Sequence, residues 1–409
     1  MLSENLIHKI DRLRARALLA GGAGVAATLA GGALWALTDD DAGIEKVFQP
    51  FLVAYIITVG LSVGCLAGVM LHHLCGGAWS FMIQRILEAA SRTLPYVLGL
   101  GVLVVLGGAW FGNLYPWTSE EFRQTHHIVE KKEAFLNLGT FTIAFFIYYA
   151  IWMSLMFLYN GWSKRVDETG DPATIARMRQ LAAPGLMVYV LSLTFAAVHW
   201  VMSLEPEWFS TIFGAWLIAG YNITIVAFAT IVLSYLAGEA PISGKITTRH
   251  FHHLGTFMCG FVIFWSYVSF CQFLLIWNAN IPEEIAWYLN RQGSLTFLTI
   301  ILMIFNWFVP MMLLLMRNNK TNPVKLRRIA FYLLAVRLID VYWNIVPSFP
   351  GNHRQLNWFT VVLVVAAAVG VIGLWVWLFL GELKKRPLLA VQDPRHHLFF
   401  LKDEAHSHA

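Results

Sequence analysis

Ten long apolar runs, separated by short polar segments, dominate the pattern of this 409-residue sequence. Each run holds about 20 or more residues, which is enough for an α-helix to cross the roughly 30 Å hydrocarbon core of a bilayer. The runs lie at about 17–37, 47–72, 93–113, 134–160, 182–204, 211–237, 254–279, 294–316, 327–346 and 358–381. The segments between them are too short for a soluble domain. The pattern therefore predicts an all-α integral membrane protein with ten transmembrane helices, and residues 1–409 are expected to form a single polytopic membrane domain.

The composition agrees with this class of protein. Hydrophobic residues make up 58% of the chain and charged residues 13%, and the mean hydropathy is +0.61. The first apolar run follows a basic segment, as the core of a signal peptide does. It is longer than the roughly 7–15 apolar residues of such a core, so we expect it to be a retained helix.

The charged residues predict the orientation of the chain in the membrane. Most of the 29 Lys and Arg residues fall in segments that ten spans place on the same side as the two termini. Because cytoplasmic loops are enriched in Lys and Arg, both termini are expected to be cytoplasmic. The opposite side is acidic, with Asp39, Asp40, Asp41 and Glu205 among its carboxylates. The pI of about 9.0 thus reflects topology, and no nucleic-acid partner is expected.

One loop between runs is itself amphipathic. Residues 76–92 read GGAWSFMIQRILEAASR, in which Trp79 belongs to an apolar face and Gln84, Arg85 and Glu88 belong to a polar face. This spacing predicts a helix at the membrane surface, with its polar face turned to water.

The ninth run carries ionisable residues, which are costly at bilayer depth and usually have a function. Arg337, Asp340 and Asn344 stand at positions i, i+3 and i+7 and therefore share one face of a helix. This stripe indicates a proton-linked or ligand-binding group. The alternative is a self-paired ion bridge that holds two helices together.

Polar residues on the second run offer a weaker signal. Tyr55, Ser62, Cys65 and His73 share a face of its helix. Such a stripe favours either a water chain for protons or ordinary hydrogen bonds between helices. The four cysteines have no C-x-x-C spacing and support neither a disulfide framework nor an iron–sulfur cluster.

Histidines gather at predicted helix ends. His72 and His73 close the second run, and His250, His252 and His253 open the seventh. One haem between these clusters is a possible arrangement, but the expected arrangement is histidines at helix ends that meet cytoplasmic water.

His199 stands apart, in the outer part of the fifth run, a few residues before Glu205. A histidine beside a carboxylate can accept a proton from a quinol and pass it outward. The alternative is a histidine that is hydrogen-bonded within the packing.

Several longer stretches resemble a known family. They are MLHHLCGGAWSFMIQRILEAASRTLP at 70–95 followed by NLYPW, WVMSLEPEWFSTIFG at 200–214, FWSYVSFCQFLLIWNANIPEEIAWYLNR at 264–291, and RLIDVYWNIVP at 337–347. Over about 50–391 the chain is similar to the ActF subunit of bacterial alternative complex III, a quinol:electron-acceptor oxidoreductase. That subunit belongs to the NrfD-like superfamily of polysulfide-reductase membrane subunits.

The resemblance implies a fold of two four-helix bundles with flanking helices, in the bacterial inner (cytoplasmic) membrane. It implies no covalently bound cofactor on this chain, quinol (menaquinol or ubiquinol) as a ligand, and haems and iron–sulfur clusters in partner subunits only. The implied partners are a sister ActC-like membrane subunit, an ActB-like periplasmic iron–sulfur subunit, multihaem and monohaem cytochrome subunits, small anchored subunits and a terminal oxidase. Arg337 and Asp340 match the family's intramembrane pair, and His72, His73 and Glu88 match its polar cluster at the inner end.

The expected function is that of a cofactor-free subunit that supports quinol oxidation and proton translocation without being catalytic alone. Alternatives are direct binding and oxidation of quinol in a periplasmic-side pocket and, more remotely, a stand-alone secondary transporter. In the expected mechanism, Arg337 biases Asp340. Asp340 exchanges protons between an inner route past Glu88, His72 and His73 and an outer exit near His199 and Glu205. The chain departs from the family pattern at His199, where an acid is common, at Thr256, where a lysine is common, and in its tail.

Overall fold

The structure is a computed structural model that describes residues 3–38, 44–240, 242–349 and 351–396. The chain is 83% helix, with no strand in the described ranges. Ten of its helical segments are long and apolar enough to cross a membrane, which confirms the predicted number of spans and makes the chain a multi-pass membrane protein. The acidic residues Asp39, Asp40 and Asp41 and the tail from residue 397 onward lie outside the described residues.

The helices of the first half are α1 (Glu4–Thr38), α2 (Glu45–Cys75), α3 (Ala78–Ser91), α4 (Leu94–Gly101), α5 (Gly107–Trp110), α6 (Glu120–Thr125), α7 (His127–Lys131), α8 (Leu138–Thr169) and α9 (Pro172–Trp200). Those of the second half are α10 (Phe213–Leu236), α11 (Thr248–Ala279), α12 (Pro282–Leu289), α13 (Thr296–Leu302), α14 (Val309–Leu315), α15 (Arg317–Thr321), α16 (Pro323–Ile345) and α17 (Trp358–Lys384). A π-helical turn joins α4 to α5 and another joins α13 to α14, so each of these pairs lies within one candidate span, Ala78–Trp110 and Gly293–Leu315.

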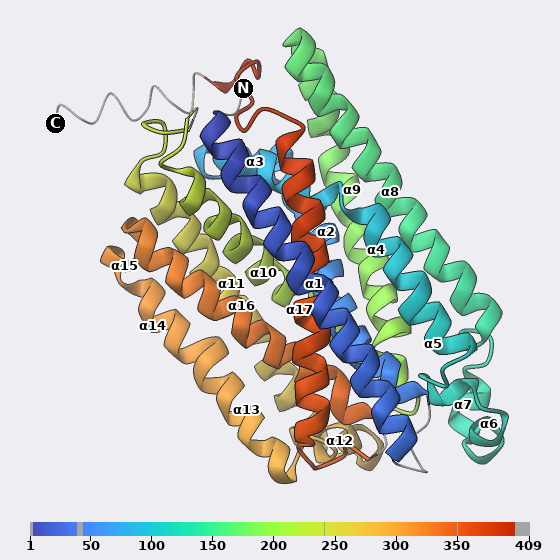
Figure 1. Cartoon of the computed structure of the whole chain (residues 1–409). Coiled ribbons are helices and arrows are strands. Elements are labelled where there is room, and N and C mark those ends of the chain that lie inside the picture. The colour runs from blue at the N-terminus through green and yellow to red at the C-terminus, as the bar shows by residue number, and fades with distance from the viewer. Residues whose placement is uncertain (1–2, 39–43, 241, 350, 397–409) are drawn as a thin grey trace.

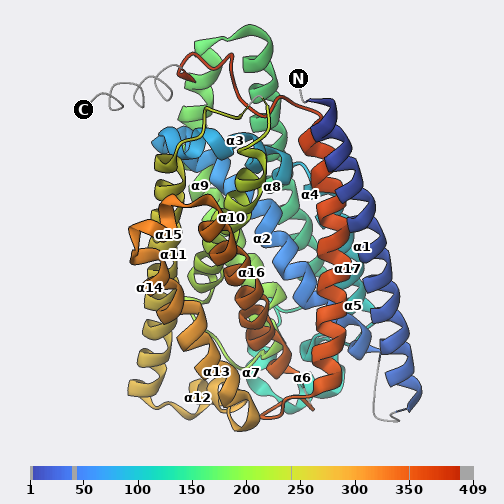
Figure 2. The ribbon, with the colours of Figure 1, turned by 60° about the vertical axis from the view of Figure 1, so that its left-hand side comes forward.

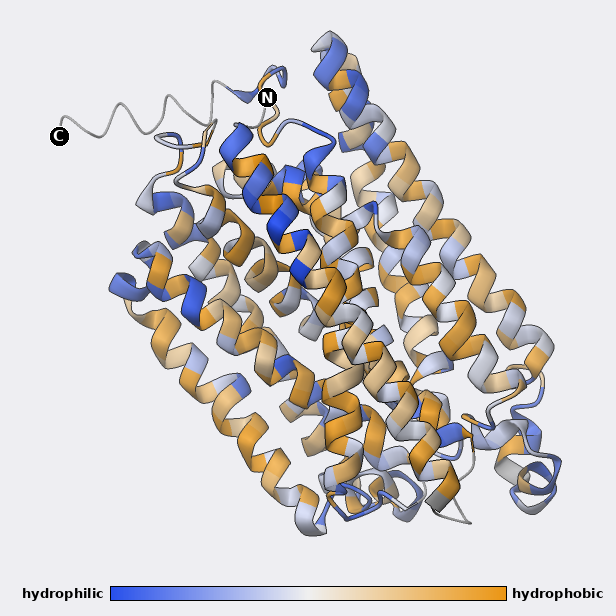
Figure 3. Cartoon of the chain, in the orientation of Figure 1, coloured by the Kyte–Doolittle hydropathy of each residue, from blue (hydrophilic) through white to orange (hydrophobic). Residues whose placement is uncertain are grey.

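Helix α1 begins at the same end of the molecule at which α17 ends (Figure 1). We call this end the termini end and the other the opposite end. Apolar residues line the middle of the helices, and hydrophilic residues gather at both ends (Figure 3). Local sequence sets several helix starts, because Asn137, Asp171, Asn322 and Asn357 each accept hydrogen bonds from backbone N–H groups of the first turn.

Helices α2 and α10 form the centre of the molecule. Helix α2 packs against α3, α9, α10 and α17, and α10 packs against α9, α11 and α16. Helix α1 lies antiparallel against α17 on the outside (Figures 1 and 2). The backbones of Gly24 and Gly370 approach each other so closely there that a side chain on either would overlap the other helix.

Candidate functional site

A cavity of about 460 Å³ lies between α11, α16 and the span formed by α13 and α14. Its wall is mostly aromatic, and Asp340 is the one charged residue in the part of the wall that the structure describes. Tyr267 and Phe270 at its rim are 63% and 60% exposed, and they belong to the membrane-spanning helix α11. The cavity therefore opens sideways, toward the bilayer. Its lining residues are Trp216, Trp265, Ser266, Tyr267, Ser269, Phe270, Phe273, Tyr288, Thr299, Leu302, Met303, Trp307, Asp340 and Trp343.

The structure brings the predicted stripe on α16 together. The Nη1 group of Arg337 donates a hydrogen bond to Oδ2 of Asp340, and the two residues are only 3% and 2% exposed. The Nδ2 group of Asn344 donates to the backbone oxygen of Asp340 at 2.8 Å. Each charge of the pair offsets the other, which is the condition for burying an Arg and an Asp at this depth.

Asp340 also faces the interior of the helix bundle. A small cavity of about 10 Å³ lies on that side, and Asp340 and Asn344 line it together with Ile56 of α2 and Val201. This is about the space that one water molecule needs. Asp340 thus stands between a cavity that opens to the bilayer and a water-sized space inside the protein.

At the opposite end, Glu205 is held by a residue that the sequence did not single out. Arg291, which is fully buried, donates from Nη1 to Oε1 of Glu205 at 2.9 Å. Its other donors reach the backbone oxygens of Trp343 and Asn344 at the end of α16 and the hydroxyl of Ser348. Burial lowers the pKa of the Arg291 guanidinium, and the Glu205 carboxylate opposes this shift. Arg291 therefore ties Glu205 to the helix that carries Asp340.

His199 lies in a separate aromatic cluster. Its Nδ1 atom and the hydroxyl of Tyr148 form a hydrogen bond of 2.8 Å, and its ring stacks on Phe135 at 4.2 Å between centroids. Since Glu205 is bound by Arg291, the two residues of the predicted proton exit belong to different clusters. The spacing of His199 and Glu205 in the sequence could not indicate that they belong to different clusters, because the chain turns between the two residues.

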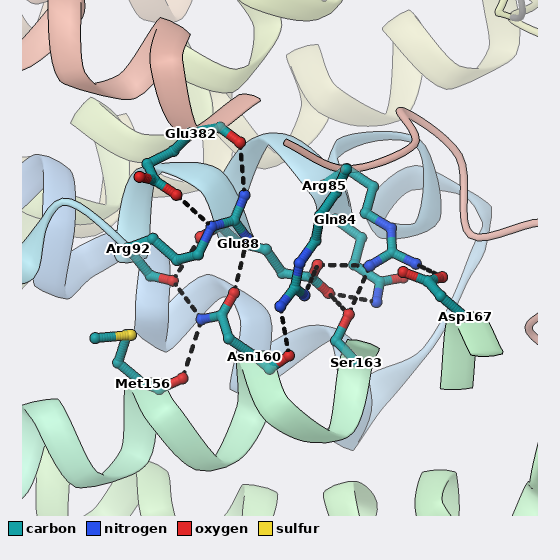
Figure 4. Close-up of polar contacts among 11 residues, drawn as sticks. Gln84, Arg85, Glu88, Arg92, Met156, Asn160, Ser163, Asp167 and Glu382 are labelled. Carbon is teal, nitrogen blue, oxygen red and sulfur yellow. Dashed lines mark hydrogen bonds and ion pairs between the residues drawn. The ribbon is translucent and has the colours of Figure 1, made fainter. Parts of the chain in front are cut away.

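Glu88 is the centre of a polar cluster at the termini end (Figure 4). Arg85 donates to its Oε2 atom at 2.7 Å, and Gln84 and Ser163 donate to its Oε1 atom at 2.8 and 2.9 Å. Arg85 also pairs with Asp167 of α8. Gln84, Arg85 and Glu88 are all buried, so the prediction that they face water was wrong. The polar face of α3 packs on α8, where partners of opposite charge replace the lost hydration.

The cluster extends to the end of α17. Arg92 pairs with Glu382 at 3.0 Å and donates to Oδ1 of Asn160 at 2.8 Å (Figure 4). Arg386, which follows α17, donates to the backbone oxygen of Asn160 at 2.8 Å. Its Nη1 atom lies 3.9 Å from Oε2 of Glu88. The segment after α17 thus covers the cluster.

His72 and His73 are buried beside this cluster, so the prediction of a helix end open to water was also wrong. The Nδ1 atom of His72 lies 2.7 Å from the hydroxyl of Ser80 on α3. His73 stacks on Tyr159 of α8, and within the described residues neither of its ring nitrogens forms a hydrogen bond. His73 lines a water-sized cavity of about 10 Å³ together with Asp393 of the segment after α17.

The other residues of the α2 stripe point to different helices. The hydroxyl of Tyr55 lies 2.9 Å from that of Tyr149 on α8. Ser62 bonds with Thr93 at 2.7 Å and accepts from Trp375 of α17 at 2.8 Å. Tyr55 and Ser62 thus form hydrogen bonds to neighbouring segments, and a water chain along the stripe stays a prediction.

Comparison with protein-family models and with curated proteins gives no match to this chain. In the described part of the chain, His, Cys, Asp and Glu side chains form no group of three or more that could hold a metal ion. The cavity at Asp340 and the charged residues around it are therefore the features of the molecule that bear on its function.

Proposed function

We propose that this chain is a membrane subunit of a quinol oxidoreductase of the alternative complex III type, and that it binds quinol in the cavity at Asp340. The observation that carries the proposal is the position of Asp340, a paired carboxylate in the wall of an aromatic cavity that opens toward the bilayer. A pocket of this kind, mostly apolar with a few polar groups, is typical of small-molecule sites.

The chemistry of a quinol fits this cavity. A quinol is neutral and dissolves in the bilayer, so it reaches a lateral opening directly, and its ring packs on aromatic side chains such as Trp265 and Trp343. Oxidation of a quinol releases electrons and protons in equal number. The Asp340 carboxylate accepts a proton from a quinol hydroxyl, and Arg337 offsets the charge of that carboxylate before the transfer.

Protons then leave Asp340 through the water-sized space that it shares with Asn344. The proposed exit is at Glu205, because Arg291 bonds both to Glu205 and to the backbone of Asn344. The cluster around Glu88 is the proposed proton entry from the termini end. Electrons pass to redox groups of partner subunits: the iron–sulfur subunit and the multihaem and monohaem cytochromes of such a complex.

The proposal includes the arrangement in the membrane. The contacts of α2 with α3 and α9, and of α10 with α11 and α16, support two four-helix bundles flanked by α1 and α17. The basic residues of the termini end, such as Arg85, Arg92 and Arg386, support a cytoplasmic location for that end in a bacterial inner membrane. The opposite end then faces the periplasmic subunits and the sister membrane subunit.

Two experiments test the proposal. Affinity purification in mild detergent, followed by mass spectrometry, is expected to recover multihaem cytochrome and iron–sulfur subunits in stoichiometric amounts. A chain that elutes alone and monodisperse contradicts membership of such a complex.

The second experiment replaces the carboxylate. We expect Asp340→Asn in the purified complex to lower quinol oxidation and the coupled proton release at least tenfold. Asp11→Asn, at a half-exposed ion pair with Lys384, is the control and is expected to leave both rates unchanged. An Asp340→Asn complex with full quinol oxidation and unchanged proton release would overturn the assignment.

A further inference from the structure

A second cavity, of about 260 Å³, lies between α2, α3, α9, α10 and α11. It shares no lining residue with the cavity at Asp340. Ala67 and Gly68 of α2 leave the space open because their side chains are small or absent, and the rest of the wall is mostly aliphatic. Helices α9, α10 and α11 stand side by side here, and α3 crosses at their termini end (Figure 2).

Tyr189 of α9 and Asn222 of α10 bring neutral polar groups to this apolar wall. Tyr189 is 2% exposed, and its hydroxyl has no hydrogen-bond partner among the described residues. A buried hydroxyl without a partner is unfavourable, so a ligand oxygen that approaches Tyr189 through the cavity would offer this hydroxyl a hydrogen bond. The amide of Asn222 adds both donors and an acceptor.

The lining restricts the class of ligand. Among the described residues, none that lines the cavity is charged, and Tyr189 and Asn222 lie near the middle of their membrane-spanning helices. A phosphate headgroup would therefore be buried without a counter-charge. Water is a poor occupant of most of the space, because each buried molecule needs two to four polar partners. Apolar cavities of about 150 Å³ already take up small aromatic molecules.

We infer that this cavity binds a neutral, lipid-soluble molecule, with a carbonyl or hydroxyl oxygen between Tyr189 and Asn222 and its hydrocarbon beside Ala67 and Gly68. Val190 at the rim is 43% exposed, which places the entry on the bilayer side of α9. The inference does not depend on the proposed function, since the two cavities are separate.

Photo-crosslinking to the full-length protein tests this site. The probes are a diazirine-bearing long-chain alcohol, a diazirine-bearing ubiquinone analogue and, as the charged comparison, a diazirine-bearing fatty acid. After irradiation and peptide mapping, a neutral probe is expected to label residues 186–190 and 218–226 saturably, at least tenfold more than the fatty acid does. Stronger labelling by the alcohol identifies the ligand as a neutral membrane lipid. Stronger labelling by the quinone analogue identifies the ligand as a quinone. Equal labelling by the fatty acid overturns the neutral class.

Two variants localise the binding. Tyr189→Phe keeps the ring and removes the hydroxyl, and it is expected to raise the half-saturating probe concentration at least fivefold. Ala67→Phe fills the space and is expected to abolish saturable labelling. Ser269→Phe, in the cavity at Asp340, is the matched control and should leave labelling here unchanged. Labelling that is not saturable, or that is the same in Tyr189→Phe, overturns the inference even if Ala67→Phe fails to fold.

Discussion

Gly220 of α10 lies directly against the guanidinium group of Arg337 of α16, and even a methyl side chain at position 220 would overlap that guanidinium. Arg337 in turn donates to Asp340. The absence of a side chain at Gly220 therefore gives the ion pair its room, and it sets how closely α10 and α16 approach at the site.

We expect Gly220→Ala to destabilise the protein by about 1–3 kcal/mol, as overpacking of a close-packed interior does. The thermal midpoint in detergent measures this effect. Gly260→Ala on α11 is the matched control, because a side chain there meets no other atom within 4 Å. The replacement of glycine in a helix interior by alanine is otherwise neutral or stabilising. Equal midpoints for the two variants would contradict the close contact with Arg337.

A second prediction concerns the hydrogen bonds that the buried Arg291 forms at the opposite end. Arg291 bonds to Glu205, to two backbone oxygens of α16 and to Ser348, and its guanidinium lies 3.4 Å from the ring centre of Trp287. A lysine keeps the charge but cannot form this fork of bonds. Arg291→Lys is therefore expected to lose at least about 2 kcal/mol of stability.

The control for Arg291→Lys is Arg123→Lys at the same end. Arg123 forms a partly exposed ion pair with Glu120, and exposed pairs of this kind contribute about 0–1 kcal/mol. Denaturant unfolding followed by tryptophan fluorescence compares the variants. If the bonds of Arg291 do not stabilise the fold, Arg291→Lys and Arg123→Lys will have the same unfolding midpoint.

A third prediction concerns the segment after α17, which covers the cluster around Glu88. Arg386→Gln removes the charge beside Glu88 and weakens the bond to Asn160. We expect faster hydrogen–deuterium exchange in residues 84–92 and a loss of about 1.5–3 kcal/mol of stability, the value of hydrogen bonds to charged groups. Lys385→Gln is the control, since the Lys385 side chain is 65% exposed and pairs with Glu382. Unchanged exchange in Arg386→Gln would show that the segment after α17 does not seal the cluster.

The spans could be predicted from the sequence because hydrocarbon thickness fixes the length of an apolar run. The stripe of Arg337 and Asp340 was equally accessible, since residues i and i+3 meet on one helix face without any knowledge of the neighbouring helices. Such features depend on one helix and its solvent alone.

What the sequence could not reveal depends on contacts between distant segments. The polar face of α3 was expected to meet water, because its spacing does not show that Asp167 and Ser163 of α8 cover it. Arg291 gave no signal for the same reason: an arginine in a short loop is usually solvated, and its burial follows from Glu205 and the end of α16. The cavity at Asp340 is likewise formed by several helices and has no counterpart in any single stretch.

The last prediction concerns a substitution that fills the cavity at Asp340 but does not change the charged residue there. Ser269 of α11 lines the cavity, and among the described residues its hydroxyl bonds only to the backbone oxygen of Trp265. Ser269→Phe therefore adds a ring to the space and leaves Asp340 and Arg337 in place. If the cavity binds quinol as proposed, the KM for quinol of the purified complex is expected to rise at least tenfold, with a smaller change in kcat, because the ring would occupy space that the quinol needs. Gly260→Phe, on the same helix in open space, is the control and should leave both constants unchanged. If Ser269→Phe folds, assembles and keeps its KM, quinol binds elsewhere, and the role of Asp340 would then be limited to proton exchange or to the pairing of α16 with α10.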